Sequence, residues 1–304
     1  MADWRFGVND SEGVQIVRVK RKSQVIPARI HLLAAKEAQV VVVLRRKPTK
    51  LFHALRWDTE RDEIESGSWF HGRIHELDSD LSFDGQFMVY AASGKGLNWT
   101  GICRPPKLRT EVDWPHAMTG AGGGVFVSAD RLEVNTDRDE AAVLEAIGKV
   151  GDKLPFEIGL LDRQRYRREL KEEYPRFYRD GFRRVGPRGR EEDVKGTRWL
   201  SISREDPVWL LRPTEGHPEL RVRYRGYQNG MTFEWDLPEL PGVLDAEVSW
   251  AVYDSLGQLI VARRGVLYRY TLSDLWAGKP SSVFDLELLE KPWERGIAAS
   301  DGQE

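Results

Sequence analysis

Arginine and aromatic residues are concentrated between residues 163 and 190, a combination suited to binding phosphate groups. The segment holds eleven basic residues against four acidic ones, a net charge of +7 in a chain whose formal net charge is −2. Arginine forks match phosphate oxygens, and aromatic rings stack on bases. The candidate binding residues here are Arg165, Arg167, Arg168, Lys171, Arg176, Arg179, Arg183 and Arg184.

The same segment also has a plainer interpretation as a solvated helix face. Glu191, Glu192 and Asp193 follow it directly. Within it, Arg168 and Glu172 can pair at helical spacing. Because the whole chain is nearly neutral, we favour this interpretation and keep nucleic-acid binding as the alternative.

A second group of candidate residues lies in the stretch from Trp69 to His75. His71 and His75 are four apart, the spacing at which two histidines on a helix can share a metal ion. Gly72 and the strand-like flanks favour extended backbone instead, where such residues are about 13 Å apart. We therefore expect no metal here, and we interpret Trp69, His71 and Arg73 as binding residues at one rim of a sheet.

No sequence signature of catalysis is present. Asp78, Asp80 and Asp84 miss the spacing of a calcium loop. Gly120–Gly124 lacks the Lys-Ser/Thr ending of a phosphate loop and is interpreted as a flexible linker. We predict no catalytic residue, metal or cofactor, although acids and bases from distant strands could still form an active site.

The start of the chain and its cysteine content favour the cytoplasm. Met1–Arg5 carries an acidic residue where a signal peptide needs positive charge. No apolar run approaches the ~20 residues that a membrane helix requires. Cys103 is the single cysteine. We expect a soluble cytoplasmic protein that does not contact membranes.

Short strands separated by glycine turns dominate the rest of the sequence. Gly85–Val89 aligns with Gly257–Val261, each opening a strand after a turn, which indicates one structural unit used twice. Asn229-Gly230 predicts a further hairpin. The other expected strands are Arg29–Ala34, Gln39–Arg45, Leu51–Trp57, Gly124–Val127, Arg198–Ser203, Val208–Arg212, Leu220–Tyr224 and Met231–Trp235.

One region, at about 137–190, departs from this pattern. Thr136–Asp139 resembles a capping box, and the apolar residues after it predict a short helix that ends near Gly148 or Gly151. Tyr166, Leu170 and Tyr174 predict a second helix that Pro175 interrupts. We expect a helical, arginine-rich insertion in a single domain spanning 1–304.

The stretch from Ser82 to Ala91 resembles the S-P-D-G-(R/K)-x-(L/I)-x-(Y/F) blade motif of TolB-like and WD40-like β-propellers, with Phe83 in place of proline. Most of the chain also resembles a group of uncharacterised bacterial β-rich proteins. The residues that carry this resemblance include Trp57, Trp69, the Asp84-Gly85 turn, Trp250 and Gly265. The resemblance implies a mainly all-β, β-propeller or propeller-like fold, in which most tryptophans form the core and an exposed tryptophan would mark a partner surface.

Three functions agree with these observations. The favoured one is a non-catalytic cytoplasmic protein-protein interaction module, such as an accessory or regulatory subunit of a bacterial signalling or defence complex. The alternatives are a nucleic-acid-associated factor that uses the arginine-rich insertion, and a propeller hydrolase or lyase. Converging carboxylates or histidines with shifted pKa values in one pocket would favour the enzyme.

Overall fold

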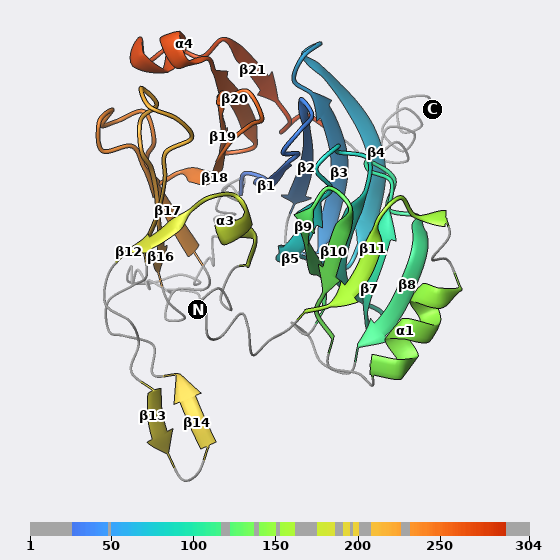
Figure 1. Cartoon of the computed structure of the whole chain (residues 1–304). Coiled ribbons are helices and arrows are strands. Elements are labelled where there is room, and N and C mark those ends of the chain that lie inside the picture. The colour runs from blue at the N-terminus through green and yellow to red at the C-terminus, as the bar shows by residue number, and fades with distance from the viewer. Residues whose placement is uncertain are drawn as a thin grey trace, which may run out of the picture.

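The computed structural model describes residues 26–47, 50–116, 122–136, 140–149, 153–161, 175–185, 191–194, 197–200, 208–225 and 232–289. Strands predominate in these ranges, which confirms the expected mainly all-β class (Figure 1). Each sheet they form is open, with two edge strands. Within these ranges no helix combines the length and apolar character needed to cross a membrane.

The sheets follow the order of the chain. The first contains β1 (Arg29–Ala34), β2 (Val40–Lys47), β3 (Leu51–Asp58) and β4 (Glu63–His71). The second contains β5 (Arg73–Leu81), β6 (Met88–Gly94), β7 (Leu97–Cys103) and β8 (Thr110–His116). The third contains β9 (Gly124–Ser128), β10 (Arg131–Val134) and β11 (Glu157–Leu160), the last parallel to β10.

The later strands repeat this antiparallel arrangement. One sheet has the order β12 (Arg183–Val185), β15 (Val208–Leu211), β16 (Leu220–Arg225) and β17 (Thr232–Asp236). A hairpin pairs β13 (Glu191–Val194) with β14 (Thr197–Leu200). The last sheet contains β18 (Val248–Tyr253), β19 (Leu259–Arg263), β20 (Val266–Tyr270) and β21 (Ser282–Asp285).

The repeated unit expected from the sequence has the same turn in both copies. Gly85 and Gly257 both have positive φ, +71° and +75°, which glycine adopts without strain. Each glycine donates its N–H to the carbonyl three residues earlier, that of Ser82 or Asp254. The two turns join the first and second strands of their sheets, which confirms the structural unit.

In the part of the chain that the structure describes, three short helices interrupt the strands. They are α1 (Glu140–Gly148), α3 (Pro175–Arg179) and α4 (Leu272–Trp276). The predicted helix ending near Gly148 is confirmed as α1, and its Val143 is buried beside the core of the second and third sheets. The Asn229-Gly230 hairpin, residues 137–139 and the face formed by Tyr166, Leu170 and Tyr174 lie outside the described residues.

We expect a helical insertion at 137–190 from the sequence, but the structure corrects this prediction, because the segment contains strands. β11 pairs with β10, and β12 pairs with β15, so the segment contributes to two sheets. Pro175 is the first residue of α3, where its missing N–H costs little, and so it begins a helix. Phe177 of α3 is buried in the main core beside Trp209 and Trp250. The described parts of the segment therefore pack into the sheets and the core.

Close packing between the second and third sheets depends on Gly123. Its φ is +82°, and a Cβ added there would overlap the carbonyl oxygen of Asp78. The glycine stretch that we interpret from the sequence as a flexible linker thus includes Gly123, which must lack a Cβ so that its backbone can contact that of Asp78. Gly96 has a similar φ of +81° with open space around it.

We expect Gly123→Ala to destabilise the fold much more than Gly96→Ala. Both substitutions place a Cβ at positive φ, which costs about 1 kcal/mol, but only Gly123→Ala adds overlap, worth roughly 1–3 kcal/mol more. Denaturant unfolding of both variants measures the difference. Equal losses of unfolding free energy would show that Gly123 has no packing role.

Candidate functional site at the β5 bulge

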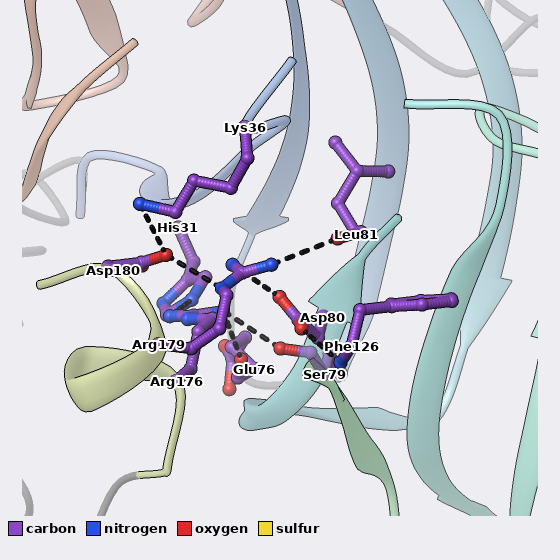
Figure 2. A network of polar contacts seen from close by, with 10 residues as sticks. All are labelled: His31, Lys36, Glu76, Ser79, Asp80, Leu81, Phe126, Arg176, Arg179 and Asp180. Atoms are coloured by element: carbon purple, nitrogen blue, oxygen red, sulfur yellow. Dashed lines mark hydrogen bonds and ion pairs between the residues drawn. The ribbon is translucent and has the colours of Figure 1, made fainter. Parts of the chain in front are cut away.

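The densest group of buried charges forms around an irregularity in β5. His75 pairs with Ala91 and Asp80 pairs with Val89, so the bulge residues 76–79 lie opposite Tyr90 alone. A bulge removes backbone groups from the regular ladder, and buried groups of this kind need other partners. α3 supplies them (Figure 2).

Arg176 of α3 donates to the bulge. Its Nη1 donates to the carbonyl oxygen of Ser79 at 2.8 Å and to that of Glu76 at 3.4 Å. The Arg176 side chain also lies over the Trp250 ring, 5.4 Å from its centroid. Only 6% of Arg176 is exposed. One guanidinium therefore connects α3, β5 and β18.

The other terminal nitrogen of Arg176 binds β1. Its Nη2 lies 2.7 Å from Nε2 of His31, which must accept because the guanidinium only donates. Burial, and secondarily the Arg176 charge, hold the pKa of His31 well below its usual value. His31 is thus a neutral acceptor, and its ring packs 3.8 Å from that of Trp250.

A second arginine, one turn along α3, binds the end of the bulge. Nη2 of Arg179 lies 2.8 Å from Oδ1 of Asp80, whose Oδ2 accepts the Phe126 N–H of β9 at 2.8 Å. Nη1 of Arg179 donates to the Leu81 carbonyl at 3.2 Å. Burial raises the pKa of Asp80, while these donors favour its charged form.

Asp180 completes the network on the other side of α3. Its Oδ1 is 2.8 Å from Nε of Arg179 and 3.1 Å from Nζ of Lys36, just beyond β1. Burial alone would lower the pKa of Arg179, but Asp180 and Asp80 more than offset it and raise that pKa. We call the six residues the charge cluster: His31, Asp78, Asp80, Arg176, Arg179 and Asp180.

Asp78 also has an unusual acidity. Burial raises its pKa from 3.8 to about 7, the Glu76 charge adds to this effect, and Arg176 opposes it. Burial also raises the pKa of Glu76. A carboxyl group with such a pKa can transfer protons at neutral pH.

The cavity on the Arg176 side of the cluster is too small to hold a substrate. The cavity lined by Arg176, Asp180 and Trp250 has a volume of about 10 Å³. This volume holds about one water molecule. Carbonyls, a carboxylate and a histidine already accept from the terminal nitrogens of both arginines, so the arrangement joins elements of the fold.

The basic residues singled out in the sequence are divided by the structure. Arg176 and Arg179 bind groups inside the protein, so neither presents its guanidinium to a nucleic acid. Arg183 is exposed and lies 3.6 Å from Glu219, and Arg184 is half-buried on β12. The remaining four, Arg165, Arg167, Arg168 and Lys171, lie outside the described residues.

The other candidate residues lie around the β4–β5 turn. Trp69 is half-buried, and its ring stacks on that of His53 at 3.9 Å. His71 ends β4 and Arg73 begins β5, both exposed. His71 and His75 are on different strands, and the described residues contain no group of three potential metal ligands.

The sequence suggests a role for Asp78 and Asp80 only as calcium ligands, and nothing in it indicates their interaction with the arginines of α3. The partners are about a hundred residues apart, and no local spacing connects them. The one available signal was the apolar surroundings of two aspartates within a strand.

The comparisons with known proteins leave the function open. No family model matches the chain, and no curated protein matches it. Among solved structures it is similar to the uncharacterized protein lmo1340 from Listeria monocytogenes EGD-e, with a TM-score of 0.28 and 10% identity over 91% of this chain and 87% of that one.

We expect Arg176→Ala to reduce the unfolding free energy by about 3–5 kcal/mol, as loss of one partner of a buried polar network does. Arg176→Lys should recover little, because an ammonium group cannot reach both β1 and the bulge. Chemical denaturation measures both.

The control for this prediction is Arg264→Ala. Arg264 is exposed and pairs with Glu247, so its loss should cost less than about 1 kcal/mol. A loss at Arg176 no larger than that at Arg264 would contradict a structural role for the charge cluster.

Asp78 should make the fold less stable as the pH rises. The pKa of Asp78 is about 7 in the folded protein and near 4 in the unfolded chain. The free energy of unfolding that protonated Asp78 contributes is therefore complete below about pH 4 and is lost as the pH rises through 7. Asp78→Asn should match the wild type at pH 4 and exceed it by a few kcal/mol at pH 8.

Unfolding free energies measured from pH 4 to pH 8 test this expectation. The exposed Asp236→Asn is the control and should follow the wild-type curve. If Asp78→Asn also runs parallel to the wild type, the acidity of Asp78 is normal.

Proposed function

We propose that this chain is a non-catalytic, cytoplasmic protein-protein interaction module whose partner binds the β21 surface of the last sheet. We define this surface by Ile26, Trp276, Val283 and Leu288. Their exposed fractions are 69%, 51%, 54% and 80%. This concentration of exposed apolar side chains carries the proposal, because such patches mark protein interaction sites.

The construction of β21 supports this surface. Ser282 and Phe284 face the first sheet, where Ser282 Oγ donates to Asp62 and the Phe284 ring lies 5.2 Å from that of Trp57. Val283, between them, is exposed. β21 is also the last strand in its sheet within the described ranges. A partner can contact both the side chains and the strand edge.

Contacts at the end of β21 bring Ile26 and Leu288 close to each other. The Ala28 N–H donates to Oε1 of Glu287, and Nζ of Lys47 pairs with the same carboxylate at 2.6 Å. Ile26 and Leu288 are the close neighbours of Ala28 and Glu287 in sequence. Trp276 ends α4, which precedes β21, and exposed tryptophans are frequent binding hot spots.

We further infer that the sheets are arranged radially, as in a β-propeller. The contacts between sheets support this: β1 contacts β5, β5 contacts β9, and α3 contacts β9. β17 contacts β18, and β18 contacts β1, so the last sheet returns to the first. In such an arrangement α3 and its arginines lie at the centre and the β21 surface lies outside.

Substitutions in the β21 surface should abolish partner binding without unfolding the protein. We expect Val283→Arg and Trp276→Ala to lose proteins that the wild-type chain recovers from a lysate of the source organism. Quantitative mass spectrometry of the recovered proteins measures the loss, and thermal melting checks the fold.

Leu256→Arg is the matched control, because Leu256 is 56% exposed in the β18–β19 turn and is not one of the four residues that define this surface. It should recover the same proteins as the wild type. Identical recoveries from all four chains, or recovery of the chain alone, would disprove the proposed interface.

A further inference from the structure

Arg29 and Arg46 lie opposite each other where β1 begins, and Arg73 is near enough for its charge to act on Arg46. Arg29 of β1 is the direct cross-strand partner of Arg46 of β2. Arg73 is the first residue of β5, which contacts β1. None of the three arginines belongs to the β21 surface or to the charge cluster, although both adjoin this place: Ala28 and Lys47 contact Glu287, and Arg176 binds the Glu76 carbonyl.

A single carboxylate accompanies these arginines. Nη1 of Arg46 lies 3.7 Å from Oε1 of Glu76, and the two side chains are 18% and 19% exposed. Arg29 and Arg73 are exposed, and neither forms an ion pair with another described residue. The group thus keeps two positive charges that the described residues do not neutralise.

Holding these charges together is unfavourable in the protein alone. Like charges directly across an antiparallel pair destabilise it. Burial lowers the pKa of Arg46, Glu76 raises it, and the nearby charges of Arg29 and Arg73 lower it further. The position of Arg46 over the Phe52 ring, 5.9 Å from its centroid, fixes the central guanidinium. A bound anion would relieve the repulsion.

We propose that Arg29, Arg46 and Arg73 form a binding site for a phosphate group, either free phosphate or the terminal phosphate of a small metabolite. Guanidinium forks match the oxygens of phosphate. The two negative charges of a phosphate group equal the two positive charges of the three arginines that Glu76 does not neutralise. The three arginines come from adjacent strand ends, which suits one compact anion better than an extended polymer.

Titration with sodium phosphate at about pH 8, where phosphate carries two charges, tests this site. We expect a rise in melting temperature and calorimetric binding that sodium chloride at equal ionic strength does not produce. Arg29→Ala and Arg73→Ala should each weaken binding about tenfold or more, because each removes a charge-assisted contact. Arg264→Ala, the exposed control, should leave it unchanged.

Glu76→Gln separates binding from stability. It removes the carboxylate that competes for Arg46, so it should strengthen phosphate binding several-fold even if the fold becomes less stable. Glucose 6-phosphate compared with phosphate distinguishes the two sources, since the one that binds more tightly is the ligand class.

Three results would overturn the proposal. They are a phosphate response equal to that of chloride, a response that persists in the Arg29→Ala/Arg73→Ala double variant, and weaker binding in Glu76→Gln. Binding of single-stranded oligonucleotide through the same arginines, with no response to phosphate or sugar phosphate, would also overturn it in favour of a nucleic-acid surface.

Discussion

The backbone carbonyls released by the β5 bulge must be satisfied away from water, and Arg176 is the group that does it. Its guanidinium binds Ser79 and Glu76 of β5, His31 of β1 and the face of Trp250 on β18. Because a buried guanidinium cannot lose its proton, every element that faces it must offer acceptors. The position of α3 and the contacts among these strands follow from that requirement.

This arrangement separates the interior from the functional surfaces. The charge cluster has the shifted acidities often found in active sites, yet the terminal nitrogens of its arginines are bound inside the protein, and the cavity on its Arg176 side holds about one water molecule. Its chemistry is used to fix α3. We therefore propose binding for two groups at the surface. They are the apolar residues of the β21 surface and the three arginines Arg29, Arg46 and Arg73.

Local features of the fold could be predicted because their causes lie within a few residues. The strand Arg29–Ala34 has four successive buried residues, as a strand covered on both faces does, and the Gly85 and Gly257 turns need positive φ. The bulge at 76–79 and the position of α3 could not be predicted in this way. Pro175 begins α3, and the helix predicted before it lies outside the described residues.

The sequence by itself determined the all-β class, the hairpin repeat and the excess of arginine before residue 190. Period-two alternation and turn glycines act at short range, so composition and spacing contain them. Only the tertiary structure decided that Arg176 and Arg179 face inward, and that Arg29, Arg46 and Arg73 lie together. Those outcomes depend on burial and on partners distant in sequence. The sequence names a charged residue but does not say whether its side chain is in water or in the core.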